Sequence, residues 1–194
     1  MKKLLITGFE PFGGEKINPS WEAVTRLSSE INGYSLTKLL LPVVFRKASD
    51  MIVKAAEKLD PDVIVCIGQA GGRNAITPEL VGINLCHASI PDNEGNQPKD
   101  ELIDVGGETA YFSSLPVRKI SEAISTCNIP SAVSYSAGTF VCNEVLYTLL
   151  SRFKDSDIKI GFIHIPYTEE QGKKPDMKMS DIVKGLTIAI ENIE

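Results

Sequence analysis

Short apolar runs typical of strands alternate with segments of helical periodicity along almost the whole chain. The run Val63–Ile67 is fully apolar and rich in β-branched residues, which indicates a strand covered on both faces. Arg46–Leu59, just before it, has the apolar spacing of an amphipathic helix and stops at Asp60-Pro61. Because strands separated by helices favour a parallel sheet, the pattern predicts an α/β fold with a mostly parallel sheet sandwiched between helix layers.

The rest of the chain continues this alternation. Further strands are predicted at Leu4–Thr7, Ser35–Val44, Leu80–Ile90, Ala132–Tyr135 and Ile158–Ile163. Further helices are predicted at Trp21–Ile31 after an Asn18-Pro19 start, at Val117–Ser125, at Phe140–Phe153, and at Asp181–Asn192 with Ser180 as its cap. The polar segment Pro91–Gly107 is expected to be a surface loop. With 194 residues, no internal repeat and no linker, residues 1–194 are expected to form a single domain.

Charge and cysteine spacing exclude several classes of function. The net charge is −5 and no run of lysines or arginines forms a basic stripe, so a nucleic-acid partner is not expected. The apolar stretch Leu4–Thr7 is too short for a signal-peptide core or a membrane span, so no membrane association is expected. The four cysteines show neither CxxC pairing nor zinc-site spacing, so no metal is expected. These features predict a cytoplasmic protein with reduced thiols.

Cys142 is the cysteine with the most chemical context. It follows Ser136–Val141, a predicted strand end and tight turn, and it lies in the first turn of a predicted helix. A thiol there is expected to gain thiolate character from the helix dipole, and the small residues before it suit an oxyanion hole. From its position alone, Cys142 could equally be a buried structural cysteine. Cys66 is predicted to be a core residue, and Cys127 has no such context.

Any Cys–His catalysis must use one of only two histidines, His87 and His164. Cys86 and His87 are adjacent in a predicted strand, so their side chains point to opposite faces, and His87 is expected at the surface. His164 ends a predicted strand at the same sheet edge as Cys142, where a neutral imidazole could take the thiol proton. Taken alone, a histidine at a strand end is more often structural.

Two further features are weak by themselves. Glu79 precedes a predicted strand and could orient an imidazole, although an exposed glutamate is the ordinary case. Gly13-Gly14 and Gly68–Arg73 each follow a strand, as phosphate-binding loops do. Neither glycine segment has a GK[ST] ending or a GxGxxG pattern, which counts against a nucleoside- or phosphate-binding enzyme.

Several separate motifs occur in one order along the chain. They are Gly8-Phe9-Glu10-Pro11-Phe12-Gly13-Gly14 with Asn18-Pro19-Ser20, then Gly68–Arg73, Pro78-Glu79, Ile90-Pro91-Asp92-Asn93, Ser136–Asn143 and His164-Ile165-Pro166. In these motifs the chain closely resembles the bacterial pyroglutamyl-peptidase I family, also called pyrrolidone-carboxylate peptidases, from about residue 1 to 190. The resemblance implies a cysteine peptidase that hydrolyses the amide bond after an N-terminal pyroglutamyl residue of peptides.

The resemblance also implies the parts of the site. The family's Cys–His–Glu triad falls on Cys142, His164 and Glu79. Its substrate-binding positions fall on five residues: Phe9, Phe12, Gln69, Phe140 and Val141. A phosphorylase/hydrolase-like α/β/α fold, a homotetramer and the absence of a cofactor are implied as well.

One position departs from the family pattern. Family members usually carry an arginine before Ile-Pro-Asp-Asn, and this chain has Ser89 there. A serine is too short to replace a guanidinium near the reaction centre, although a bound water or Arg73 could do so. The departure leaves open a lactam-binding homologue with weak or no turnover.

Overall fold

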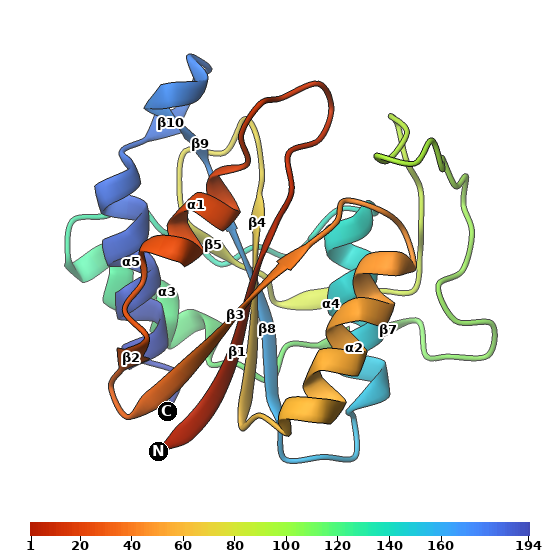
Figure 1. Cartoon of the computed structure of the whole chain (residues 1–194), viewed down its shortest axis with the longest axis horizontal. Helices are drawn as coiled ribbons and strands as arrows, with labels where there is room; N and C mark the ends of the chain where they lie inside the picture. Colours follow the sequence, from red (N-terminus) through yellow and green to blue (C-terminus); the bar gives the residue numbers. More distant parts are fainter.

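A six-stranded sheet forms the centre of the computed structural model, which describes residues 1–194 (Figure 1). Its strands are β1 (Lys2–Phe9), β2 (Glu30–Ile31), β3 (Tyr34–Leu41), β4 (Val63–Gln69), β5 (Thr77–Pro78) and β8 (Lys159–Ile165), in the spatial order β2-β3-β1-β4-β8-β5. The four long strands run parallel, and only the short edge strands β2 and β5 are antiparallel to their neighbours. The carboxyl ends of β1, β4 and β8 therefore open on the same edge of the sheet.

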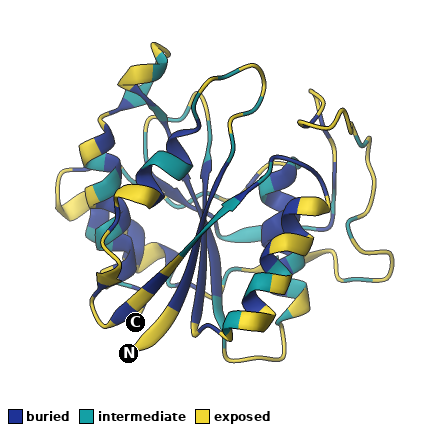
Figure 2. Ribbon diagram, in the orientation of Figure 1, coloured by how far each residue is buried: buried dark blue, intermediate teal, exposed yellow.

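Helices cover both faces of this sheet (Figure 1). The helices α1 (Pro19–Arg26), α3 (Val117–Thr126) and α5 (Met179–Glu191) lie on one side, and α2 (Lys47–Leu59) and α4 (Val141–Arg152) lie on the other. Alternate strand residues enter two separate cores: Leu4 packs in the first, and Leu5 packs in the second. The strands β1, β4 and β8 are buried along almost their whole length, whereas β3, next to the edge strand β2, is partly exposed (Figure 2). The predicted α/β fold class is therefore confirmed.

The predicted strand Leu80–Ile90 is wrong in extent. Only β6 (Val81–Ile83) forms a strand, and it pairs with β7 (Ala110–Phe112) outside the main sheet. The side chain of Asn143 accepts a hydrogen bond from the amide of Ile83 and donates to the carbonyls of Ile83 and Leu85. The strand therefore ends at Ile83, where the side chain of Asn143 binds the backbone groups that a neighbouring strand would otherwise bind. Cys86, further on, makes only an isolated bridge to Glu101.

Two other boundaries differ from the prediction. The helix expected to reach Ile31 ends at Arg26, because Leu27 is extended and Asn32-Gly33, both with positive φ, turn the chain so that β2 pairs with β3. The segment Ala132–Tyr135 joins the sheet edge through isolated bridges rather than as a regular strand.

The C-terminal part adds small elements and the last helix. A short pair of strands, β9 (Tyr167–Thr168) and β10 (Asp176–Met177), flanks a turn of 3-10 helix at Glu169–Gln171. The helix α5 is capped by the backbone of Lys178 rather than by Ser180. No helix in the structure is both long and apolar enough to cross a membrane.

Candidate active site

A mostly apolar cavity of about 210 Å³ opens at the carboxyl edge of the sheet. It is lined by Phe9, Phe12, Asn18, Val43, Gln69, Ala70, Arg73, Ala137, Gly138, Phe140, Val141, Cys142 and His164. All five predicted substrate-binding residues and two of the three predicted catalytic residues are among them. Phe9 and Val141 are almost fully buried, so each presents only an edge to the cavity and otherwise packs in the core. Residues from five separate stretches of the chain thus meet around one space.

Glu79 lies directly behind His164. It is fully buried, and its Oε1 lies 2.7 Å from Nδ1 of the imidazole. Its backbone amide also donates to the carbonyl of Phe162, on the same strand as His164. Backbone pairing and the side-chain contact together fix the carboxylate against the ring.

The protonation states of this pair follow from burial and partners. Burial raises the pKa of Glu79, but the hydrogen bonds with His164 and Arg73 outweigh it and leave that pKa below the ordinary value. Burial lowers the pKa of His164, and Glu79 opposes the shift only in part. An ionised carboxylate therefore faces a neutral imidazole at neutral pH. Because the carboxylate only accepts, Nδ1 carries the proton and Nε2 is left as the base.

Cys142 lies over the sheet near His164 because Gly68 has no side chain there. Gly68 of β4 is the register partner of His164 on β8, and a Cβ built on Gly68 would lie 3.1 Å from Cys142 Sγ. Glycine at this position leaves room over the sheet for the ring of Phe162 and for the thiol. The thiol and the imidazole line the same cavity without a direct hydrogen bond. Such contacts often tighten only in the substrate complex.

The resting thiol is protonated, contrary to what its helical position alone predicts. Burial raises the pKa of Cys142 to about 12, and the charge of Glu79 adds to this rise. The opposing effects of Arg73 and of the cysteine's own amide are smaller. Nucleophilic attack therefore requires a base to take the proton.

The N-terminus of α4 offers free hydrogen-bond donors next to the thiol. Its N-cap residue, Phe140, has no side chain that could accept a hydrogen bond. The amides of Cys142 and Asn143 have no partner in the structure, as expected for a first helical turn. Gly138, with a φ of 78°, turns the chain into this helix. An oxyanion held near Cys142 Sγ would accept hydrogen bonds from these amides.

Aromatic rings and one backbone segment form the opposite wall. Phe140 packs between Phe12, at 6.2 Å between ring centroids, and Phe45, at 5.1 Å in an edge-on arrangement. At the end of β4, the amide of Ala70 donates to Ile165. Alternate residues of a parallel strand bond to the same neighbour, so the backbone N–H and C=O of Gln69 face away from β8. Pairing with β1 has already ended at Cys66, which leaves these two groups available to a ligand.

Arg73 belongs to the site, although its position in a glycine-rich segment did not identify it. Its guanidinium donates to Glu79 at 2.7 Å, to Thr77 at 2.6 Å and to the carbonyl of Ser136 at 3.0 Å. These bonds tie the carboxylate to the segment that leads into Cys142. Because these three bonds hold the guanidinium of Arg73 against Glu79, Thr77 and Ser136, Arg73 is not free to take the place of the arginine that Ser89 replaces.

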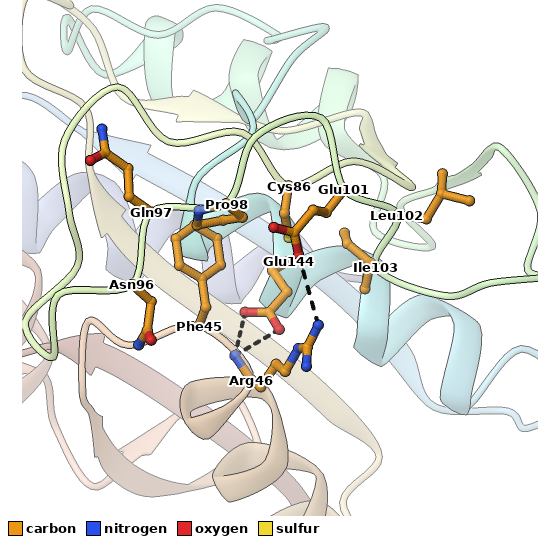
Figure 3. Close-up of a pocket in the computed structure, with 10 residues that line it drawn as sticks. All are labelled: Phe45, Arg46, Cys86, Asn96, Gln97, Pro98, Glu101, Leu102, Ile103 and Glu144. Atoms are coloured by element: carbon orange, nitrogen blue, oxygen red, sulfur yellow. Dashed lines mark hydrogen bonds and ion pairs between the residues drawn. The ribbon is translucent and has the colours of Figure 1, made fainter.

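A second cavity, of about 340 Å³, lies on the far side of the start of α4 (Figure 3). Glu144, two residues after the candidate nucleophile, is buried there and accepts hydrogen bonds from the amide of Arg46, at 2.8 and 2.9 Å, and from the hydroxyl of Ser49. The carboxylate thereby satisfies the N-terminus of α2. This cavity contains neither Cys142 nor His164, so its size does not make it the reaction site. Its contacts fix α4 against α2.

Ser89 is exposed and does not line the catalytic cavity. The segment that carries it is nevertheless held to the nucleophile loop. The amide of His87 donates to the carbonyl of Thr139, and the hydroxyl of Thr139 donates back to the carbonyl of His87. A long side chain at position 89 would therefore start close to the mouth of the site. The side chain of His87 itself is half exposed, as expected, and contacts Asp100.

Known proteins are similar to this chain in sequence and in fold. A family model described as pyroglutamyl peptidase matches residues 2–194. The pyrrolidone-carboxylate peptidase of Staphylococcus saprophyticus is 50% identical, with 98% of this chain and 92% of that protein covered. That of Brachyspira hyodysenteriae is 49% identical, with 97% of both chains covered.

Solved structures agree with the sequence relatives. The crystal structure of Bacillus amyloliquefaciens pyroglutamyl peptidase I has a TM-score of 0.94 at 49% identity and covers 100% of this chain and 97% of that one. A mutant pyrrolidone carboxyl peptidase from the hyperthermophile Pyrococcus furiosus has a TM-score of 0.93 at 40% identity, with 98% of this chain and 97% of that one covered.

Proposed function

The chain belongs to the pyroglutamyl peptidase family, whose members are cysteine peptidases, and we propose that it releases N-terminal pyroglutamyl residues from peptides through Cys142, His164 and Glu79. The observation that carries this assignment is the 2.7 Å contact between buried Glu79 and His164 at the cavity that also holds Cys142. An oriented imidazole beside a thiol is the arrangement that covalent acyl transfer needs.

The reaction has two halves. Nε2 of His164 takes the thiol proton while Sγ attacks the carbonyl carbon after the lactam ring, and the amides at the start of α4 hold the resulting oxyanion. The imidazolium then protonates the leaving amine, the C–N bond breaks, and a pyroglutamyl thioester remains on Cys142. His164 next takes a proton from water, and the hydroxide attacks the thioester. Free pyroglutamate leaves as the thiol regains its proton.

Recognition of the lactam follows from the cavity walls. Pyroglutamate is a flat, uncharged five-membered ring, and an apolar cavity of about 210 Å³ with rings of Phe12 and Phe140 suits such a group. The free N–H and C=O of Gln69 can pair with the lactam C=O and N–H. A ring that lacks these groups would leave them unpaired, which disfavours its binding.

The proposal is tested with a pyroglutamyl fluorogenic amide, with and without a thiol alkylator. Hydrolysis that the alkylator abolishes is expected. Binding of the amide without hydrolysis would instead support the alternative that the protein is a lactam-binding homologue with weak or no turnover.

Replacing Phe12 by alanine is expected to raise KM about tenfold with a smaller change in kcat. The ring contributes apolar contact to ground state and transition state alike, so its loss weakens binding uniformly. Steady-state kinetics on the fluorogenic amide measures the split. Met51→Ala is the matched control, because Met51 is 40% exposed on α2 and lies outside the cavity. An unchanged KM in Phe12→Ala would show that the ring does not contact the substrate.

Replacing Ser89 by arginine is expected to raise kcat/KM at least roughly tenfold, equivalent to about 1.4 kcal/mol of transition-state stabilisation. A guanidinium at the mouth of the site would add donors and positive charge for the oxyanion. Ser89→Gln, a shorter polar side chain without charge, serves as control. Should Ser89→Arg fold normally and hydrolyse the amide no faster, a guanidinium at this position would not assist the reaction.

The quaternary state and compartment are proposed as well: a homotetramer of residues 1–194, each chain a single domain, in the cytoplasm. The segment between β6 and α3 exposes three large apolar side chains, those of Leu102, Val105 and Phe112, which suits contact with further copies. All four cysteines are unpaired, which suits a compartment that keeps thiols reduced. Light scattering on the purified protein measures the number of chains.

A further inference from the structure

The segment Ser131–Ser136 forms the outer margin of the sheet next to β5. Ser134 donates its amide to the carbonyl of Pro78 at 2.9 Å and accepts from the amide of Leu80 at 2.8 Å. Ala132, two residues earlier, donates to the carbonyl of Ile76 at 3.2 Å. Even-numbered residues of the segment are therefore bonded inward, toward the sheet.

Two odd-numbered residues, Val133 and Tyr135, face outward with unpaired backbone groups. The backbone N–H and C=O groups of Val133 and Tyr135 make no hydrogen bond in the structure. Because bonding alternates along an extended segment, these groups lie on its outer edge. The residue Tyr135 is exposed, with 62% of its surface accessible. Such a free edge can accept an added strand through main-chain hydrogen bonds.

This edge leads directly into the catalytic cavity. An open groove of about 440 Å³ runs along it and is lined by Arg73, Thr77, Val133, Ser134, Tyr135 and Ser136. Arg73 lines both this groove and the catalytic cavity, and Ala137-Gly138, immediately after the groove, line the cavity. The groove and the cavity are thus consecutive parts of one surface.

We propose that the peptide residues after pyroglutamate bind in extended form along the Val133–Tyr135 edge, as a short added strand. This proposal rests on the proposed function. The lactam ring is the first residue of the substrate, so the rest of the peptide must leave the cavity, and the groove continues from it. Since the chain runs from Val133 toward the cavity while the substrate runs away from it, the added strand is antiparallel.

Antiparallel pairing makes a specific demand on the substrate. One substrate residue exchanges both main-chain hydrogen bonds with Tyr135. The substrate residues on either side of it make no main-chain hydrogen bond to Tyr135. Tyr135 lies two residues before Ala137, and extended chains advance about 3.3 Å per residue. The paired residue is therefore the second or third after pyroglutamate, so longer peptides are better substrates than pyroglutamyl amides.

The test compares pyroglutamyl peptides carrying one to four further residues with the short fluorogenic amide. We expect kcat/KM to rise about tenfold at the second or third residue, and N-methylation of that residue's nitrogen to remove the gain. N-methylation of an adjacent residue should have little effect. Equal kcat/KM for all lengths, or the same loss wherever the methyl group is placed, would overturn the proposal. Lack of hydrolysis of every substrate, the short amide included, would instead refute the proposed function.

A pair of enzyme variants tests the same edge from the protein side. Tyr135→Pro removes the backbone N–H and is expected to lose the length-dependent gain while still hydrolysing the short amide. Tyr135→Ala keeps the backbone and should retain the gain. If Tyr135→Pro changes the number of chains in the assembly and leaves the length dependence intact, the edge pairs with a second copy of the chain and the proposal is wrong. The N-methylated substrates give the same answer on the unmodified enzyme should the proline variant not fold.

Discussion

Cys142→Ser is expected to abolish hydrolysis of pyroglutamyl amides, while Cys66→Ser, Cys86→Ser and Cys127→Ser each retain it. Only Cys142 lines the cavity that contains His164. A serine hydroxyl is a much weaker acid than a thiol, and the imidazole here is tuned to remove a thiol proton. Rates of the four variants on the fluorogenic amide measure the difference.

The three other cysteines are matched controls of different burial. Cys66 is fully buried in β4, where burial raises its pKa to about 12, so its replacement is expected to lower the melting temperature without removing activity. Cys127 is exposed and should have almost no effect. A Cys142→Ser enzyme with a near-normal rate would rule out this thiol as the nucleophile.

Glu79→Gln is expected to lower kcat by up to about 10⁴, the loss seen when the carboxylate that orients a catalytic imidazole is replaced by its amide. An amide can donate to Nδ1, which would place the proton on Nε2 and remove the base. The guanidinium of Arg73, bonded to Glu79 at 2.7 Å, would also lose its counter-charge beside the imidazole. Glu79→Asp, which keeps the charge, is the matched control and should retain more activity.

The pH profile gives an independent reading of the same pair. Activity requires a neutral His164, whose pKa burial holds below 6.5, so kcat/KM should stay level as pH falls to about this value and decline only below it. Glu79 raises the pKa of His164, so its removal should move the acid limb of the residual activity to still lower pH. An acid limb that moves to higher pH in Glu79→Gln would contradict the assigned contact.

The sequence by itself determined the general architecture and the sheet edge at which Cys142 and His164 lie. Val63–Ile67 is a continuous apolar run, and Ile158–Ile163 is apolar except for Lys159. Runs of this kind are typical of strands covered on both faces. The two strands indeed pair in parallel at the centre of the sheet. Because parallel strands end at one edge, the positions of Cys142 and His164 after predicted strands already indicated that they lie close together.

The tertiary structure alone decided the partners and the proton positions. Glu79 and His164 are 85 residues apart, and nothing local in either segment requires their 2.7 Å contact. Arg73 was missed for the same reason, since its role depends on where Glu79 and Ser136 lie after folding. The helix position of Cys142 predicted a thiolate, whereas burial keeps the thiol protonated. A pKa depends on the surroundings in three dimensions, and long-range packing creates those surroundings.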